Sequence, residues 1–321
     1  MNFKKKIVLA VLVGLSSAAF LTFPIYLRTD RPVSFERKEI VLMAVGDVML
    51  DRGVEYKIRE TGNNDFRFPF LKISSYLRGA DLLFGNLESV VSDKGKKVGS
   101  IYSFRADPRA VEGLVYAGFD VLSVANNHVF DYGREAMEDS FFRIKEAGME
   151  YVGGGLTENS ARQGVVKEVR GTKISFLGYN NQGSPYWKAE GNKSGINWIS
   201  EEIAGDIKEA KEKSDLIVVS FHYGTEYQEI PSETQKKFSY LAIDSGADLV
   251  VGHHPHVIQP VEKYKKGWIA YSLGNFVFDQ YFSEKTMKGL LLEITIRGKE
   301  IKDVNSVKVK ISEDYQPFVE L

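Results

Sequence analysis

The chain has 321 residues, of which 43% are hydrophobic and 26% are charged, and this composition is typical of a folded globular protein. It excludes a disordered chain, a collagen-like repeat and a membrane protein with many spans. The 42 Lys and Arg residues nearly balance the 43 Asp and Glu residues, giving a net charge of −1, so we expect no nucleic-acid partner. Cysteine is absent, which excludes disulfides, thiolate metal ligands and a cysteine nucleophile.

The N-terminus has the pattern of a membrane segment. Three lysines at positions 4–6 precede an uncharged apolar run over residues 7–27, and about 20 helical residues at roughly 1.5 Å each cross a hydrocarbon core of about 30 Å. The lysines predict a single-pass anchor in the cell membrane, residues 1–27, with a cytoplasmic N-terminus and an extracytoplasmic domain. A cleaved signal peptide is the alternative, because the small residues at 16–19 suit a signal peptidase.

The rest of the chain divides into a tether and one domain. Residues 28–39 are polar and charged, and over residues 40–321 short apolar runs alternate with helical patterns. This alternation predicts an α/β fold with central sheets. The runs predicted as strands are Ile40–Val45, Leu82–Phe84, Val121–Val124, Ile174–Leu177, Leu216–Ser220, Leu249–Val251 and Ile269–Ser272.

Capping residues place the helices between these strands. Asp107 predicts a helix that begins at Pro108. Ser232 and Gln235 form a capping-box pattern, and Gly246 ends the helix that follows them. Apolar residues at helical spacing mark two further helices, around 137–144 and 203–210.

Polar side chains of the kinds that bind metals follow six of the predicted strands. In an α/β sheet, ligands bind beyond the carboxyl ends of the strands, so we expect one shared site. All five histidines of the chain lie in these positions, which random placement would not produce. The segments are Gly46-Asp47, Gly85-Asn86-Leu87-Glu88, Asn126-Asn127-His128, Phe221-His222-Tyr223-Gly224, Gly252-His253-His254-Pro255-His256 and Gly274-Asn275-Phe276.

The residue types in these segments indicate a metal site. Imidazole, carboxylate and amide oxygen without thiolate suit Mn²⁺, Fe²⁺ or Zn²⁺. A lone histidine after a strand is usually a satisfied core residue, but five together with Asp47, Glu88 and Asn127 favour one or two bound ions. A two-metal site can activate water and stabilise the attacking and leaving oxygens. His128 is placed to be the catalytic acid, because its neighbour Asn127 can take the metal.

The same motifs resemble those of a known family. They are Gly46-Asp47-Val48-Met49-Leu50, Gly85-Asn86-Leu87-Glu88, Ala125-Asn126-Asn127-His128, Phe221-His222-Tyr223-Gly224, Gly252-His253-His254-Pro255-His256 and Tyr271-Ser272-Leu273-Gly274-Asn275-Phe276. In this order, over residues 40–278, they resemble the capsule-synthesis proteins of the CapA type, which are associated with poly-γ-glutamate production and export in bacteria. The resemblance implies the fold of the calcineurin-like metallophosphoesterases, a four-layer αββα sandwich with the site at one sheet edge.

The resemblance also implies residue roles. Asp47 matches the first metal-binding aspartate, and Glu88 stands at the place of the bridging carboxylate. Asn127 matches the metal-ligating asparagine, and His128 matches the catalytic histidine. The histidines that match metal ligands are His222, His253 and His256, whereas His254 is expected to be a neighbour of the site.

Three positions depart from the phosphoesterase pattern. Met49 stands where an Asp-x-His motif has its histidine. Asn86 follows Gly85 where the second motif has an aspartate. Val129 stands where the third motif has an acidic residue. The first metal position therefore lacks one ligand of that pattern, and the motifs do not establish phosphoesterase activity.

Four residues are assigned to substrate binding: Asn86, Arg105, Tyr223 and Asn275. Arg105 could meet an anionic group with two hydrogen bonds, and Tyr223 and Glu226 lie beside His222 in the sequence. An ordinary structural or surface role is the alternative for Arg105, Tyr223 and Glu226.

Two functions of different class are expected. The first, implied by the resemblance, is a membrane-anchored extracytoplasmic component of poly-γ-glutamate capsule synthesis or export. It would handle an anionic polymer beside other membrane subunits of a capsule synthase. The second is a metal-dependent hydrolase that acts on phosphoesters or on a cell-envelope polymer.

Overall fold

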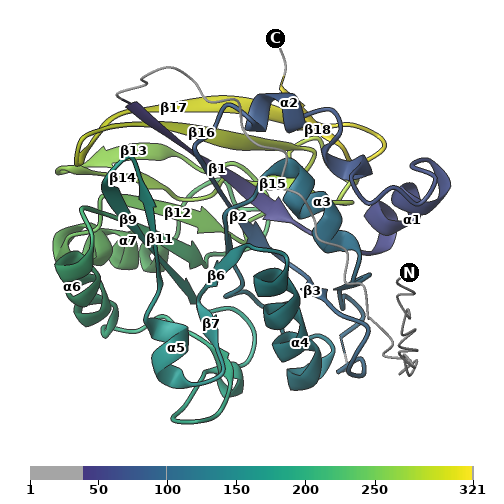
Figure 1. Cartoon of the computed structure of the whole chain (residues 1–321), viewed down its shortest axis with the longest axis horizontal. Helices are drawn as coiled ribbons and strands as arrows, with labels where there is room; N and C mark the ends of the chain where they lie inside the picture. The colour runs from purple at the N-terminus through teal and green to yellow at the C-terminus, as the bar shows by residue number, and fades with distance from the viewer. Residues whose placement is uncertain (1–38, 99, 320–321) are drawn as a thin grey trace, which may run out of the picture.

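The structure, a computed structural model, describes residues 39–98 and 100–319 (Figure 1). The predicted anchor, 1–27, and all of the predicted tether except its last residue lie outside these ranges. Within them, no helix is both long and apolar enough to cross a membrane.

The larger sheet brings together eight strands of the described chain. They are β1 (Glu39–Val48), β2 (Leu82–Leu87), β5 (Val121–Ser123), β6 (Glu150–Val152), β15 (Asn275–Val277), β16 (Lys288–Arg297), β17 (Glu300–Ile311) and β18 (Pro317–Val319). Their order is β18-β17-β16-β1-β2-β5-β6, and β15 also pairs with β1. β1 is parallel to β2 and β15, whereas β16, β17 and β18 form an antiparallel flank.

The second sheet has six strands in the order β13-β14-β12-β11-β9-β8. Their bounds are β8 (Val165–Val169), β9 (Thr172–Asn180), β11 (Leu216–His222), β12 (Leu249–His253), β13 (Val261–Tyr264) and β14 (Gly267–Ala270). β9, β11, β12 and β14 are parallel. Two short ladders complete the strands, β3 (Val90–Val91) with β4 (Arg105–Ala106) and β7 (Gly154–Gly155) with β10 (Gly195–Ile196).

The helices alternate with the strands, as the sequence predicts. They are α1 (Arg52–Glu60), α2 (Ser74–Leu77), α3 (Ala110–Ala117), α4 (Gly133–Glu146), α5 (Glu158–Arg162), α6 (Ile203–Lys213) and α7 (Glu233–Ser245), with short 3₁₀ helices at Phe68–Phe70 and Pro185–Trp187. The capping box of Ser232 and Gln235 begins α7, and Gly246 ends it. α3 begins two residues later than predicted, because the Asp107 side chain accepts from the backbone N–H of Arg109 and so forms a separate turn.

Three apolar clusters determine how these elements pack. Residues such as Leu42 and Phe84 of the larger sheet face Phe176 and Val218 of the second sheet, and the rings of Phe84 and Phe176 stack at 5.6 Å. The other face of the larger sheet is covered by α1 to α4, and the other face of the second sheet by α6 and α7. Figure 1 shows these two groups of helices on opposite flanks. The prediction of an α/β fold is confirmed.

Strand register gathers polar residues at one edge of each sheet. In the larger sheet, Asp47 pairs with Asn275 on one side and with Asn86 on the other. In the second sheet, His222 of β11 pairs with His253 of β12. Because these strands are parallel, their carboxyl ends meet at a common edge, as the sequence predicts.

Steric crowding explains why glycine stands at two positions of this edge, 46 and 252. A Cβ atom on Gly46 would lie 2.0 Å from the carbonyl oxygen of Gly274. A Cβ atom on Gly252 would lie 1.9 Å from the carbonyl oxygen of Tyr271. Only glycine therefore fits directly before the first polar residue that each of β1 and β12 contributes to the site.

Candidate metal centre

Asp47 lies at the end of β1 and is fully buried. Its Oδ1 is 3.1 Å from His253 Nδ1, its Oδ2 is 3.3 Å from His256 Nδ1, and the backbone N–H of His254 donates to Oδ2. Burial favours the neutral acid, but the hydrogen bonds and charges of His253 and His256 outweigh it and hold the pKa of Asp47 well below its ordinary value. Asp47 is therefore an ionised group between two imidazoles.

Glu88 follows β2 and is also fully buried. Its Oε2 accepts from the side chain of Asn86, but its Oε1 has no hydrogen-bond partner. This Oε1 lies 3.5 Å from Nε2 of His256 and 3.9 Å from Nε2 of both His128 and His222. A buried carboxylate oxygen with no partner costs free energy unless another group satisfies it. Three imidazole nitrogens around such an oxygen form an arrangement that a cation would complete.

Burial also sets the protonation of the surrounding groups. It raises the pKa of Glu88 well above its ordinary value, and the charge of Asp47 adds to this effect. It lowers the pKa of His222 well below its ordinary value, and the pKa of His254 to about 3. The neighbouring His254 also lowers the pKa of His222, and His256 also lowers the pKa of His254. Both histidines are neutral at neutral pH, which is the form that binds metals.

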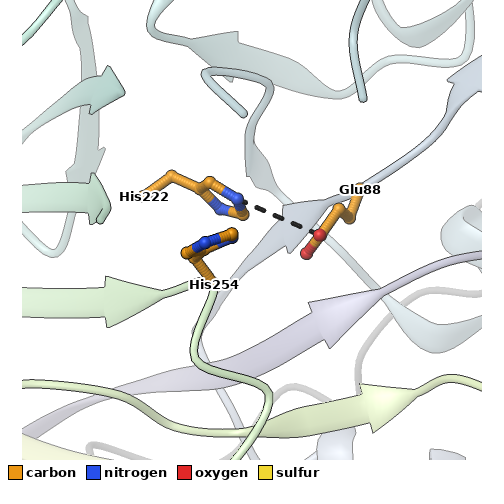
Figure 2. Close-up of side chains that lie close together, drawn as sticks. All are labelled: Glu88, His222 and His254. Carbon is orange, nitrogen blue, oxygen red and sulfur yellow. Dashed lines mark ion pairs between the residues drawn. The ribbon is translucent and has the colours of Figure 1, made fainter. Parts of the chain in front are cut away.

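The described residues contain three groups of side chains that could bind a metal. Within each group, the ligand-type atoms all lie within 4.8 Å of one another. The groups are Glu88, His222 and His254; Asp47, Glu88 and His256; and Glu226, His254 and His256. Figure 2 shows how Glu88, His222 and His254 converge. Glu88 belongs to two of the groups, which fits the bridging role that the resemblance implies.

The geometry adds His254, which the sequence predicts as a neighbour, to the candidate ligands; the role of His253 stays a prediction. His254 belongs to two of the groups, and its Nδ1 is buried without a partner. His253 belongs to none of them, although its Nε2 is also buried without a partner. Backbone φ is 96° at His254 and 57° at His256. Such left-handed conformations are strained for side chains of this size and are common at functional sites.

Asn127 and His128 reach the site from the loop after β5. Oδ1 of Asn127 lies 2.7 Å from Nε2 of His222. Nδ1 of His128 lies 2.7 Å from Oδ2 of Asp131, and its ring stacks on Phe104 at 4.0 Å. Because Asp131 holds Nδ1, Nε2 of His128 is left facing the site. This is the arrangement of an oriented proton donor.

Asp131 is not among the site residues predicted from the sequence. The family pattern places an acid directly after the histidine, where this chain has Val129. A turn in which the N–H of Asp131 donates to the carbonyl of His128 brings the acid back three residues later. The i, i+3 spacing from His128 was the only signal for it in the sequence.

The two other departures have clear structural outcomes. The sulfur of Met49 accepts from the backbone N–H of Asp51, and the buried side chain belongs to the core beneath the helices. The amide nitrogen of Asn86 lies 2.9 Å from Asp47 Oδ1 and 3.1 Å from Glu88 Oε2. Asn86 is thus a neutral donor that holds two carboxylates together.

The four residues assigned to substrate binding all bond other protein groups, two of them within the site and two outside it. Asn86 is buried among the carboxylates, and Oδ1 of Asn275 lies 3.0 Å from Nδ1 of His256, which it orients. The hydroxyl of Tyr223 bonds Ser239 of α7, within the core on the outer face of the second sheet. The guanidinium of Arg105 donates to the carbonyl of Lys94 and lies over the ring of Tyr132.

An open cleft of about 570 Å³ leads to the centre. Its described lining includes two carboxylates, Asp131 and Glu226, and no lysine or arginine. The remaining lining residues include Val98, Tyr102, Asn127, His128, Phe130, Trp187 and His254. An anionic ligand in this cleft therefore finds no positive side chain on the lining and depends on a bound cation for attraction.

The site residues fit a divalent cation with nitrogen and oxygen ligands. Among the described residues, the buried side-chain atoms without a hydrogen-bond partner include Oε1 of Glu88, Nε2 of His253 and Nδ1 of His254, and all three are metal-ligand types. No thiolate competes, because the chain has no cysteine.

Comparison with solved structures identifies the fold. A phosphatase from Mycoplasma pneumoniae, at 16% identity, superposes with a TM-score of 0.52 over 86% of this chain and 96% of that chain. A putative 5′-nucleotidase from Staphylococcus aureus, also at 16% identity, gives a TM-score of 0.54 over 88% of this chain and 54% of that chain. At this level of identity the likeness extends to the fold alone, an α/β architecture shared with phosphatase and nucleotidase structures.

Comparison with known sequences identifies the family. Capsule biosynthesis protein CapA of Bacillus anthracis is 33% identical over 86% of this chain and 69% of its own length. PGA biosynthesis protein CapA of Bacillus subtilis is 35% identical over 74% of this chain, but the match spans only 62% of its length. The family model described as "Bacterial capsule synthesis protein PGA_cap" matches residues 41–280. The chain therefore belongs to the PGA_cap family of bacterial capsule synthesis proteins.

Proposed function

We propose that the protein is a membrane-anchored extracytoplasmic component of poly-γ-glutamate capsule synthesis or export, and that its domain acts through a divalent metal centre. Family membership supports the capsule role. In this proposal residues 1–27 are a single-pass anchor, residues 28–39 a tether and residues 40–321 a four-layer αββα domain. Its partners are the anionic polymer and other membrane subunits of a capsule synthase.

One observation carries the metal centre. Oε1 of Glu88 is buried, has no hydrogen-bond partner and faces the Nε2 atoms of three histidines within 3.9 Å. Asp47, Glu88, Asn127, His222, His253 and His256 are the predicted ligands, and the geometry adds His254. A bound divalent cation (Mn²⁺, Fe²⁺ or Zn²⁺) would supply positive charge and Lewis acidity at this edge of the sheets.

The cleft explains how the site would take an anionic polymer. Within the described part of the chain its lining carries no lysine or arginine, so a chain of carboxylates would be drawn to the cation. Buried Asn86 and Asn275 hold Asp47 and His256 in place from beneath. Tyr102 and Trp187 offer apolar surface beside the centre, against which the methylene groups of a polymer can pack.

A metal-dependent hydrolase is the second candidate function, and the pair of His128 and Asp131 favours it. Asp131 fixes Nδ1 of His128, which lines the cleft, and Nε2 lies 3.9 Å from Oε1 of Glu88. His128 in this orientation can deliver a proton to a leaving group from Nε2. The substrate would be a phosphoester or a cell-envelope polymer, and cutting the exported polymer is compatible with the capsule role.

Complementation tests the proposal. The full chain is expressed in a bacterium that makes poly-γ-glutamate but lacks its own CapA-type protein, and surface polymer is measured with an antibody. The wild type should restore the polymer, whereas Glu88→Gln and a chain without residues 1–27 should not. Glu168→Gln, an exposed acid on β8, is the matched control and should restore it.

Metal content of the same purified full-length proteins gives a second result. After loading with Mn²⁺ or Zn²⁺ and desalting, the wild type and Glu168→Gln should retain metal and Glu88→Gln should not. Restored polymer in Glu88→Gln would overturn the role of the metal centre. Restored polymer without residues 1–27 would overturn the anchor.

A further inference from the structure

Glu226 is a carboxylate at the mouth of the cleft, outside the ligand set that the family pattern implies. It lies on the loop after β11 and is exposed, whereas the other members of the three groups are buried. Its carboxylate lies within 4.8 Å of ligand nitrogens of both His254 and His256. Glu226 therefore lies next to the centre on its solvent-exposed side.

The backbone around Glu226 is fixed to the segment that carries these two histidines. The N–H of Tyr227 donates to the carbonyl of Pro255, at 2.8 Å, and the side chain of Gln182 donates to the carbonyl of Gly224. Gly224 has a φ of 99° and Tyr227 a φ of 63°, so the chain turns sharply on both sides of the acid. The loop thus places Glu226 over His254 and His256 through its own main chain.

The position of Glu226 relates it to both halves of the centre. His254 belongs to the group with Glu88 and His222, and His256 belongs to the group with Asp47 and Glu88. Glu88 joins these two groups from the buried side. The exposed Glu226 lies within 4.8 Å of one histidine of each group.

One half of the centre is short of a ligand. The group of Asp47, Glu88 and His256 has three ligand residues, and Met49 adds nothing because its sulfur is engaged with the backbone of Asp51 in the core. A divalent metal with nitrogen and oxygen ligands takes four or more donors. Glu226 lies within 4.8 Å of one member of this group, His256.

We propose that Glu226 is a further metal ligand, which closes the centre on its solvent side and supplies a donor that Met49 does not. This inference rests on the proposed metal centre. An oxygen ligand on an exposed loop adds affinity without supporting the fold. Loss of Glu226 therefore weakens metal binding and leaves the metal-free protein equally stable.

Titration calorimetry of the full-length protein with Mn²⁺ tests the proposal. Glu226→Gln should bind Mn²⁺ at least about 10-fold more weakly than the wild type, the lower end of what lost support for a metal ligand costs. Glu229→Gln is the matched control, because Glu229 is an exposed acid on the same loop whose carboxylate pairs with Lys285. It should bind like the wild type. Thermal unfolding without metal should be the same for all three proteins.

Asp47→Asn separates this inference from the proposal on which it rests. This variant should lose Mn²⁺ binding altogether. If Asp47→Asn loses binding but Glu226→Gln binds like the wild type, the inference about Glu226 is wrong and the centre stands. If Asp47→Asn binds Mn²⁺ like the wild type, the metal centre itself is wrong.

Discussion

The two ends of the same strands follow different rules. In β1 and β11, residues before the carboxyl ends, such as Leu42 and Val218, pack between the two sheets, where Phe84 and Phe176 stack. At the carboxyl ends of the same strands stand polar residues: Asp47 is the penultimate residue of β1, and His222 is the last residue of β11. At the same edge, just after β2, Oε1 of Glu88 is buried without a hydrogen-bond partner.

The difference shows how the fold tolerates a site whose buried polar groups lower the stability of the protein. Apolar packing between the sheets contributes roughly 25 cal/mol for each Å² removed from water. This packing holds the strands together whatever residues stand at their carboxyl ends. Buried polar groups at those ends are then tolerated, although they lower the stability of the metal-free protein. Substitutions at the two ends should therefore have opposite consequences.

The largest effect is expected at the polar end, on chemistry. If the protein is a hydrolase, His128→Ala should lower turnover about 10²–10⁴-fold, because the proton donor is lost. Metal content should be unchanged, since His128 is outside the three ligand groups. Turnover of phosphoesters and of poly-γ-glutamate, measured beside metal content, checks this. Normal turnover in His128→Ala would exclude His128 as the catalytic acid.

The next effect is expected at the apolar end, on stability. Phe176→Ala removes a ring that is buried between the sheets, so the free energy of unfolding should fall by about 3–5 kcal/mol. Phe142→Ala makes the same change on α4 at a ring that is 61% exposed, and should have little effect. Denaturant titration of the metal-free proteins measures both. Equal losses in the two variants would contradict the assignment of the core.

Sequence alone predicts the apolar ends well because their pattern is repetitive. Each predicted strand lies in one of the two sheets, and parallel strands bring their ends together whatever the details of the loops. This is why Asp47, Glu88, Asn127 and His222 are predicted correctly to converge. Their identity as ligands stays a prediction.

Residues whose direction depends on local backbone geometry are harder to predict. The geometry adds His254 to the candidate ligands, and φ turns positive at this residue, just beyond the end of β12. Asp131 reaches His128 through a turn that no periodic pattern indicates. Tyr223 is different, because side chains alternate along a strand and His222 faces the site. Alternation alone predicts that Tyr223 faces away from the site, into the core on the outer face of the second sheet.

A smaller effect, with the opposite sign, is expected from Glu88→Gln. Because the pKa of Glu88 is raised in the folded protein, the metal-free fold is destabilised once pH rises above the ordinary range of a glutamate, and this loss is complete above the raised pKa. Glu88→Gln cannot ionise, so it should stabilise the metal-free protein at neutral pH by on the order of 1–3 kcal/mol, since one pKa unit corresponds to about 1.4 kcal/mol. In acid, where both states are protonated, the gain should vanish.

Metal provides the control for that variant. Mn²⁺ at about 100 times its dissociation constant should stabilise the wild type by about 2.7 kcal/mol. It should not stabilise Glu88→Gln. Thermal and denaturant unfolding, with and without Mn²⁺, measure both quantities. A metal-free Glu88→Gln protein less stable than the wild type at neutral pH would show that the carboxylate supports the fold.

The smallest effect is expected far from both ends, at the start of α7. The side chain of Ser232 accepts from the backbone N–H of Gln235, so Ser232→Ala should lower the free energy of unfolding by about 1 kcal/mol. Ser232→Asp keeps an accepting oxygen and should restore most of this loss, which distinguishes capping from packing. Neither change should alter Mn²⁺ affinity, because α7 covers the outer face of the second sheet. A parallel loss of Mn²⁺ affinity in Ser232→Ala would mean that the outer helices position the site, and that the two ends of the strands are not independent.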